Sequence, residues 1–554
     1  MALIVHQGLV CEWHEGAFLD QAQLGYGLQQ LWRLVAGTAS WQGPPPLRMA
    51  CADAAVVTRM LDAAPGTLPW VQLAAVAPAS WPSGLDTDRL PALCAVAADR
   101  LHFDGLGTFP MDLVCATFLQ LTRWEEWTRP DPDAFGCHKE DASLAARQGF
   151  RDRPVLDEWA CVLRAWLLVA APTWVPALPV YRVDFSHDID VLRNYTGLGR
   201  IARTVARKLV KERQGLASLD ALGEGLRALR DQGQDPCITA FDTLMDFSEA
   251  QGGRSTFFFM ASRPGPHDDG YAVDSPLFLS LAGRIRQRGH QLGWHPGYQA
   301  AQDDEVFAEE FTRIGQALGV ARFGARHHFL RWRAGFSWRR LARAGITFDA
   351  SVGYNYALGF RASTAQAYPA FDLEAGQPLA LEVKPLIAMD GPLQRAGTPV
   401  ATGLSLLARR CAAVRGTLTV LIHTALGVSW ALAPLSFAIV LVTALVFAAI
   451  HQVLFLALPR VAVIASVLLL ALQVTVTGGV YPIELLAAPF AAASPYLPFT
   501  YAANAMQALF TVGDVGASSP GIVGLIVFGS LAVSVSAIAM VRVRSVRFTR
   551  VATG

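Results

Sequence analysis

The sequence predicts an α/β protein in three parts: an N-terminal α/β domain (residues 1–175), a second α/β domain (176–415) and a C-terminal α-helical membrane region (416–554). Two observations predict this class. Apolar, strand-like runs alternate with helical patterns between residues 179 and 386, which favours a parallel sheet. Charged residues almost disappear after residue 415, which is typical of sequence that spans a membrane.

The composition of the whole chain excludes two classes of protein. Its 554 residues are 53% hydrophobic and 16% charged, with a formal net charge of +1, and the mean hydropathy is +0.32. Intrinsic disorder is excluded because apolar and aromatic residues are plentiful. The chain has no basic excess of the kind that binds phosphate backbones, so we expect no nucleic-acid partner.

The N-terminal part contains two predicted helices. Apolar residues recur at helical spacing from Asp112 to Glu126 and again from Val155 to Ala170. The first helix ends in two glutamates, which we expect to be solvated or paired with arginine. None of the eight cysteines forms a CxxC pair, so they are typical of reduced core thiols in a cytosolic domain. The first residues show no signal-peptide pattern, and we expect this part to stay in the cytosol.

In the second domain, apolar runs predict strands at 180–190, 255–260, 290–294, 323–330 and 380–386. Helices are predicted at 241–251 and 277–288 between them. In parallel α/β folds the chemistry lies at the carboxyl ends of the strands. The residues suited to chemistry follow three of these strands: His187, Asp188 and Asp190, then His295, and then Arg326, His327 and His328.

Asp188 and Asp190 are two residues apart at the end of an apolar strand. Two carboxylates in this position can divide the work, one binding a divalent metal and the other taking a proton from water. A single Asp-x-Asp pair is weak evidence, but three strand ends that each carry His or Asp form a stronger pattern. The alternative is that each histidine caps or hydrogen-bonds a buried loop.

The C-terminal region predicts about four membrane spans. The 44 residues from Gly416 to Pro459 contain no charged side chain, which is enough for two spans divided at Pro434. Further spans are predicted at 461–480 and 521–541. The arginines that flank these segments fall on one side of the membrane under the positive-inside rule, so both termini and the N-terminal domains are expected in the cytoplasm.

Residues from about Val180 to Asp390 resemble a known family. The segments FSHDID, RGHQLGWHPGY, ARHHFLRW, FDASVGYNYALGFR and LEVKPLIAMD are similar, in this order, to the polysaccharide deacetylase (NodB homology) domain of carbohydrate esterase family 4. They resemble most a bacterial branch with an extra N-terminal domain of unknown function, which MDLVCATFLQLTRWEEW and RPVLDEW also match. The resemblance implies a distorted (β/α) barrel and the metal-assisted removal of acetyl groups from N-acetylated sugars.

The resemblance also implies roles for individual residues. Asp188 would be the general base and Arg326 would orient its carboxylate. Asp190 and His295 would be metal ligands. Asp349 and Tyr354 stand where the family builds its substrate pocket.

Two positions depart from the pattern of the family. Its second metal-binding histidine would fall at residue 299, where this chain has Gln299, and an amide is a poor zinc ligand. His328 or His187 could supply the missing ligand to a divalent metal such as Zn, Co or Mn. The late histidine that acts as general acid in the family corresponds to His423, which also lies in the uncharged C-terminal run.

From Leu421 onward the chain resembles the C-terminal membrane region of the phage-infection-protein (Pip) family, whose members are related to ABC-transporter permeases. The matching text is LIHTALGVSWALAPL and LQVTVTGGVYPIELLAAPFAAASPYLPFTYAANAMQALF. The N-terminal span and the large extracytoplasmic region of that family have no counterpart here. The two resemblances meet near residues 415–423.

The sequence therefore predicts a deacetylase-like hydrolase tethered to the bacterial inner membrane as a multi-pass protein. Its expected partners are an N-acetylated saccharide substrate and the lipid bilayer. One alternative is a non-catalytic anchored relative, which Gln299 favours. The other is a membrane transport or export component, which only the C-terminal quarter supports.

Overall fold

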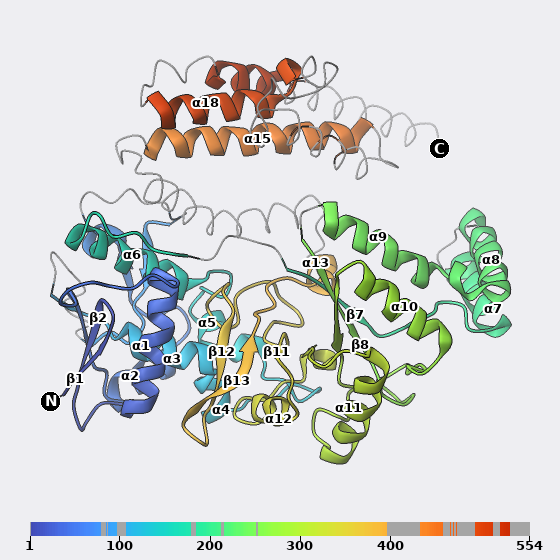
Figure 1. The fold of residues 1–554 in the computed structure, drawn as a ribbon, viewed down its shortest axis with the longest axis horizontal. Coiled ribbons are helices and arrows are strands. Elements are labelled where there is room, and N and C mark those ends of the chain that lie inside the picture. Colours follow the sequence, from blue (N-terminus) through green and yellow to red (C-terminus); the bar gives the residue numbers. More distant parts are fainter. Residues whose placement is uncertain are drawn as a thin grey trace. The chain divides into compact units, whose positions relative to one another are not determined.

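The computed structural model describes residues 2–78, 85, 87–96, 107–178, 184–211, 215–250, 253–395, 433–457, 466, 469, 473, 494–512, 521–531 and 534. The chain divides into two compact units, one made of residues 1–81 and 87–413 and the other of residues 82–86 and 414–554 (Figure 1). The predicted domain boundary after residue 175 lies within the first unit and stays a prediction.

The N-terminal part of the first unit is built on a four-stranded sheet with the order β1-β2-β3-β6. The β1–β2 pair is antiparallel, whereas β2–β3 and β3–β6 are parallel. Strands β4 and β5 form a separate two-stranded antiparallel sheet. The strands are β1 (Ala2–His6), β2 (Leu9–Trp13), β3 (Leu47–Ala50), β4 (Trp70–Gln72), β5 (Arg89–Pro91) and β6 (Thr108–Phe109), and the α-helices are α1 (Gln21–Ala36), α2 (Ala54–Asp62), α3 (Leu113–Thr122), α4 (Trp124–Thr128), α5 (Leu144–Arg147) and α6 (Val155–Ala170).

The two helices predicted in this part both form. Helix α6 has the predicted bounds, and its buried face includes Trp159 and Leu163. The other predicted helix is divided into α3 and α4 at Arg123, whose backbone is left-handed with φ of 58°. The break turns Glu125 and Glu126 of α4 toward the protein interior.

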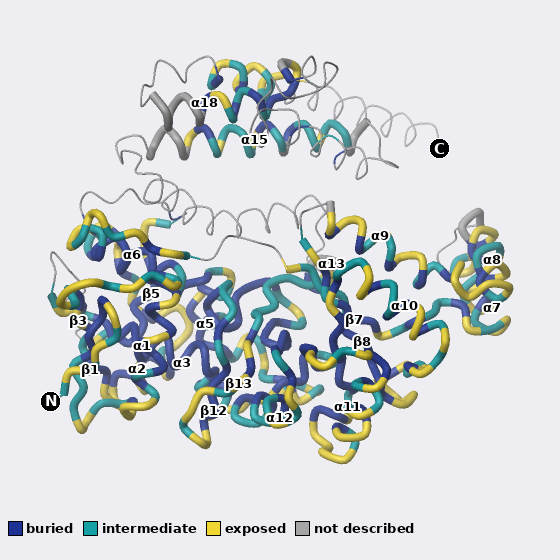
Figure 2. The backbone as a smooth tube through the Cα atoms, in the orientation of Figure 1, coloured by how far each residue is buried: buried dark blue, intermediate teal, exposed yellow. Residues whose placement is uncertain are grey.

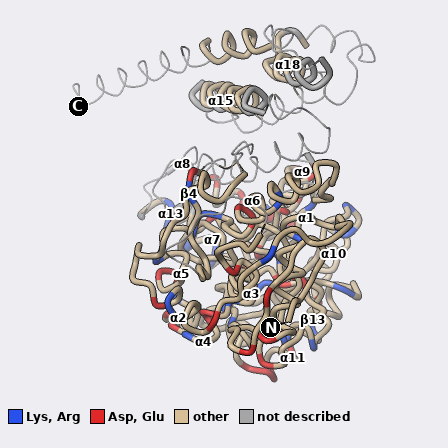
Figure 3. Tube along the Cα trace, turned by 90° about the vertical axis from the view of Figure 1, so that its left-hand side faces the viewer, with Lys and Arg blue, Asp and Glu red and all other residues tan. Residues whose placement is uncertain are grey.

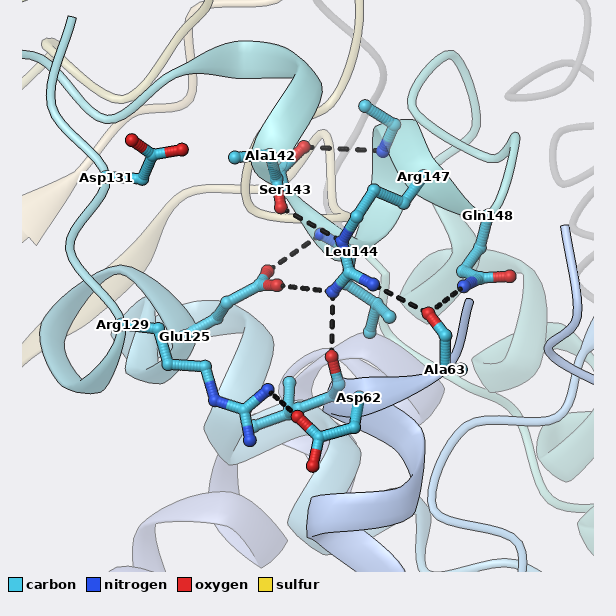
Figure 4. Close-up of polar contacts among 12 residues, drawn as sticks. Asp62, Ala63, Glu125, Arg129, Asp131, Ala142, Ser143, Leu144, Arg147 and Gln148 are labelled. Atoms are coloured by element: carbon cyan, nitrogen blue, oxygen red, sulfur yellow. Dashed lines mark hydrogen bonds and ion pairs between the residues drawn. The ribbon is translucent and has the colours of Figure 1, made fainter. Parts of the chain in front are cut away.

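Neither glutamate is solvated, because both are buried against arginines. Glu126 is held by Arg123 at 2.8 Å and by Arg361 at 2.6 Å. Glu125 accepts a hydrogen bond from the backbone of Leu144 and pairs with Arg147 at 3.0 Å (Figure 4). The pairs connect α4 to α5 through Arg147 and to the segment between residues 349 and 368 through Arg361.

The second sheet has seven strands in the order β12-β13-β11-β10-β9-β8-β7. All neighbouring pairs are parallel except β12–β13. Its strands are β7 (Phe185–Ile189), β8 (Ser255–Phe259), β9 (Gln291–Trp294), β10 (Gly324–Ala325), β11 (Phe348–Asp349), β12 (Tyr368–Asp372) and β13 (Gln377–Val383).

Figure 1 shows α9 and α10 beside β7 and β8, whereas α7 and α8 lie farther from the sheet. Strand β8 is almost wholly buried (Figure 2), as expected for a parallel strand covered on both faces. The helices are α7 (Leu198–Ala206), α8 (Gly215–Arg230), α9 (Pro236–Ala250), α10 (Pro276–Gln287), α11 (Asp304–Leu318), α12 (Ser337–Arg343) and α13 (Asp390–Arg395).

The prediction of a closed barrel is wrong. Among the described residues, the outer strands β7 and β12 each pair with one neighbour only, so the sheet stays open. The N-terminal part covers the β12 side: the Tyr26 hydroxyl donates to the carbonyl oxygen of Pro369 at 2.7 Å, and the Tyr26 ring packs on Phe371. These contacts cover part of the β12 edge.

Two glycines shape the inner face of this sheet. The register places Asp188, Phe258, Gly293 and Gly324 side by side on β7, β8, β9 and β10. A Cβ atom on Gly293 would lie 2.5 Å from the Phe258 ring, and one on Gly324 would collide with the Phe348 ring. Because both glycines lack a side chain, the Phe258 and Phe348 rings can pack against this face of the sheet. We call these two rings the aromatic floor.

We therefore expect Gly324→Ala to lower the free energy of unfolding by about 1–3 kcal/mol, the usual cost of overpacking a core. The measurement is the midpoint of urea denaturation. Gly315 of α11 is a matched control because a Cβ atom there meets nothing within 4 Å. Gly315→Ala should leave stability unchanged or raise it by up to about 1 kcal/mol, and equal effects of the two changes would contradict this account of the floor.

The second unit contains α15 (Ala433–Ala457), α18 (Pro498–Val512) and a helical segment at 521–531. Ile439, Ala502, Ala505 and Leu525 form their shared core. The described parts of α15 and α18 carry no Lys, Arg, Asp or Glu (Figure 3).

The predicted membrane region and multi-pass location are contradicted. Within the described ranges, no helix combines the length and apolar character needed to cross a membrane. Helix α15 begins at Ala433, so Pro434 lies in its first turn, where proline is tolerated. An apolar run alone does not distinguish a span from a helix that buries its side chains against a neighbour. Most of the predicted spans before residue 433 and at 461–480 lie outside the described residues.

Candidate metal centre

The carboxyl ends of five parallel strands meet at one edge of the seven-stranded sheet. Ile189, Phe259, Trp294, Ala325 and Asp349 are aligned across β7, β8, β9, β10 and β11. The next residue of each strand segment lies one position beyond this aligned row. Because side chains alternate along a strand, these next residues share a face of the sheet with Asp188, Phe258, Gly293 and Gly324. They include Asp190, His295 and Arg326.

Three potential metal ligands gather there. Asp190, His295 and His328 present one ligand atom each, and these atoms lie within 4.8 Å of one another. The Asp190 Oδ1 atom is 3.2 Å from His295 Nε2 and 3.8 Å from His328 Nε2. The structure thus brings together the three predicted ligands, which come from three different chain segments.

Both imidazoles are held with the same nitrogen facing Asp190. The Nδ1 atom of His295 lies 2.5 Å from the carbonyl oxygen of Arg326, so this nitrogen carries the proton and donates it. The Nδ1 atom of His328 lies 2.8 Å from Asp268 Oδ1. Each Nε2 atom therefore faces Asp190 and could bind a metal ion once it is free of its proton, an arrangement in which outer partners orient the ligand histidines.

The exposure of the three side chains leaves one side of the group open. His295 is 2% exposed and His328 12%, whereas the Asp190 side chain is 53% exposed. Burial acts to raise the pKa of Asp190, but the hydrogen bond to His295 and the charges of both histidines hold it below its usual value. Burial likewise acts to lower the pKa of His295, and the two aspartates outweigh it and raise that pKa.

The donor set fits a divalent transition metal. Two imidazole nitrogens and a carboxylate oxygen suit Zn²⁺, Co²⁺ or Mn²⁺, and three protein ligands with an open position are typical of a catalytic site. The fit rests on the aligned Nε2 atoms and on the exposed carboxylate.

A second carboxylate stands beside this group. Asp188 Oδ1 accepts a hydrogen bond from Arg326 Nη1 at 3.0 Å. Arg326 also donates to Ser186 Oγ and to the carbonyl oxygen of Ala350, and its guanidinium lies over the Phe258 ring. Because all three guanidinium nitrogens donate hydrogen bonds, Arg326 holds the Asp188 carboxylate in one orientation. The sequence resemblance implies the same relationship.

The two predicted pocket residues lie elsewhere around the site, and their role stays a prediction. Asp349 is fully buried and accepts hydrogen bonds from Trp338 and Ser351, and burial raises its pKa to about 6. Tyr354 is buried, and the centre of its ring lies 5.9 Å from the Arg151 guanidinium carbon. Arg151 belongs to the N-terminal part.

The remaining histidines are placed as follows. His187 turns away from the ligand group, with its Nε2 atom 3.0 Å from Ser255 Oγ. His327 is buried against Ser351. Gln299 is exposed, and its backbone carbonyl caps the turn before α11. His423 lies outside the described residues.

Sequence reasoning missed Asp268, which orients His328 and also accepts from the backbone of Tyr298. Its signal was available, because Asp268 and Asp269 follow the predicted strand at 255–260. Gly297 keeps the space for this carboxylate, since a Cβ atom there would lie 2.9 Å from Asp268 Oδ2.

We expect Asp268→Asn to weaken zinc binding about 10- to 100-fold, the usual effect of removing a carboxylate that orients a ligand histidine. Titration of the metal-free protein with zinc against a competing chelator measures this change. Asp269→Asn is the matched control, since Asp269 is an exposed residue whose nearest cation is Arg200 at 3.8 Å. Unchanged affinity in Asp268→Asn would remove Asp268 from the metal centre.

Comparisons with known proteins assign no activity to the chain. Residues 72–172 match a family of unknown function, DUF7033. This match covers well under half of the chain and lies in the N-terminal part, where it includes α3 and α6. No curated protein and no solved structure matches.

Proposed function

We propose that this protein is a metal-dependent hydrolase of the deacetylase type, which removes acetyl groups from N-acetylated sugars. The observation that carries the proposal is the convergence of Asp190, His295 and His328 beside the oriented Asp188 carboxylate. The sugar substrate comes from the sequence resemblance to polysaccharide deacetylases, and the metal centre is compatible with it.

Asp190, His295 and His328 would hold the metal ion. When bound, the ion polarises a carbonyl oxygen and lowers the pKa of a coordinated water toward about 7. Asp188 accepts the proton of the attacking water, because its carboxylate lies at the same edge as the ligands and is accessible to solvent. Arg326 keeps that carboxylate in place through a hydrogen bond at 3.0 Å. The products are acetate and a free amine.

The test is acetate release from oligomers of N-acetylglucosamine by the full-length protein supplied with zinc, cobalt or manganese. We expect activity with at least one metal and none in the presence of a chelator. A folded, metal-loaded protein that releases no acetate would contradict the proposed reaction.

The competing function is a non-catalytic relative that binds glycans. Gln299 favours it, since the ligand expected there from the family is missing. His328 would supply a third ligand atom in its place, because it lies in the same group as Asp190 and His295. Metal content of the wild-type protein and of His295→Ala separates the two functions. Loss of one bound ion in His295→Ala supports the hydrolase, whereas equal metal content in a protein that still binds glycan supports the alternative.

A further inference from the structure

A second group of potential ligands lies in the N-terminal part, apart from the proposed catalytic centre. The Sγ atoms of Cys11 and Cys51 are 3.2 Å apart. Together with the carboxylate of Asp112 they form a buried group whose ligand atoms lie within 4.8 Å of one another. The proposed hydrolysis uses none of these residues.

The fold explains why three distant residues meet. Strands β2 and β3 are parallel, with Cys11 opposite Met49, and Cys51 follows two residues later on the same face. Asp112 is the N-cap of α3, and its carboxylate accepts from the backbone of Cys115 at 2.8 Å and of Ala52 at 2.7 Å. Backbone hydrogen bonds therefore fix the carboxylate beside the two thiols.

Asp112 is a buried carboxyl group with no cationic partner among the described residues. Asp112 is 2% exposed, and no Lys, Arg or His in the described ranges forms an ion pair with it. Burial raises the pKa of this carboxyl to about 6, and the backbone hydrogen bonds oppose the shift only in part. Buried carboxylates are usually paired with a cation or bound to a metal.

The lining of this group is rich in sulfur. The Cys115 thiol interacts with the Cys94 thiol and lies close enough to Asp112 and Cys51 to be affected by their charges. The Cys94 Sγ atom lies 3.8 Å from Met60 Sδ. Thiolate and thioether groups favour soft metal ions over Mg²⁺ or Ca²⁺.

We propose that Cys11, Cys51 and Asp112 bind a thiophilic divalent cation of the Zn²⁺ class, which ties β2, β3 and the start of α3 together. Both thiols release their protons as the ion binds, so the charge of the divalent ion is shared by two thiolates and the buried carboxylate. The site is structural, because its ligands are enclosed in the core of the N-terminal sheet. It is independent of the proposed hydrolase activity.

The test is cobalt titration of the full-length protein after removal of metal. Thiolate ligands give Co²⁺ an intense sulfur-to-metal charge-transfer band in the near ultraviolet, whereas the Asp190, His295 and His328 group contains no sulfur. We expect one equivalent of Co²⁺ to develop this band in the wild-type protein. His295→Ala should keep the band and lose the other equivalent.

Cys51→Ser should lose the band, and Cys237→Ser should keep it, because Cys237 lies on α9 in the other part of the unit. Circular dichroism checks that each variant is folded. The wild-type spectrum decides the question even if a variant fails to fold: a folded protein with saturating Co²⁺ and no charge-transfer band overturns the proposal.

A disulfide is the rival use of two adjacent thiols. Mass spectrometry of the non-reduced protein, digested after alkylation of free thiols, distinguishes the two. Alkylated Cys11 and Cys51 after metal removal support the cation site. A Cys11–Cys51 disulfide in the protein as purified overturns it.

Discussion

Asp188→Asn is expected to reduce acetate release by about 10²- to 10⁴-fold, the usual contribution of a general base. The amide has nearly the shape of the carboxylate and can still accept the hydrogen bond from Arg326 Nη1. It cannot take a proton from water. The change should therefore lower kcat while leaving metal content and the denaturation midpoint close to those of the wild-type protein.

Two measurements make this prediction specific. Steady-state kinetics give the loss of kcat, and metal analysis shows that the centre is still loaded. Asp274→Asn is the matched control, since Asp274 is an exposed carboxylate of the same part of the chain. If Asp188→Asn keeps more than about a tenth of the wild-type kcat, Asp188 is not the general base.

Glu126→Gln should produce the largest loss of stability, about 3–5 kcal/mol in the free energy of unfolding. Glu126 is buried between Arg123 and Arg361. Because glutamine carries no charge, the substitution leaves two buried guanidinium groups without the negative charge that Glu126 provides. Urea denaturation measures the effect. The control is Asp141→Asn: the Asp141 side chain is 97% exposed in its pair with Arg151, and we expect a change below about 1 kcal/mol.

The pH dependence of this effect follows from the same contacts. Burial acts to raise the pKa of Glu126, but the charges of Arg361 and Arg123 outweigh it and hold this pKa well below its usual value. The stabilisation is then fully present above the unfolded pKa of about 4.3, and it declines as the pH falls toward the folded pKa. The difference between the wild-type protein and Glu126→Gln should shrink below about pH 4, and a difference that grows there would contradict the account.

The sequence predicted which side chains meet at the edge of the second sheet better than it predicted the shape of the sheet. Asp188, Asp190 and His295 follow strands that were recognisable from apolar runs, and parallel strands necessarily bring their ends to one edge. Strand β11 was missed because its two residues, Phe348–Asp349, are too few to show a period. The open sheet was missed because the contacts between Tyr26 and β12 join residues more than 340 positions apart.

The C-terminal quarter was interpreted wrongly for a different reason. A long apolar sequence is compatible with burial in lipid and with burial against other helices, and composition alone does not separate them. The packing of Ile439 on Ala502 and Ala505 is a property of the folded unit that no local window contains. Similarly, the Cys11 and Cys51 thiols lie close together because β2 pairs with β3. The spacing of the cysteines in the sequence does not reveal this pairing.

The most direct test of the central claim is a crystal structure of the protein grown with zinc, with anomalous scattering recorded at the zinc absorption edge. We predict an anomalous peak about 2.0–2.2 Å from Asp190 Oδ1, His295 Nε2 and His328 Nε2. A map without a peak at these three side chains, from crystals in saturating zinc, would contradict the metal centre on which the proposed hydrolase depends.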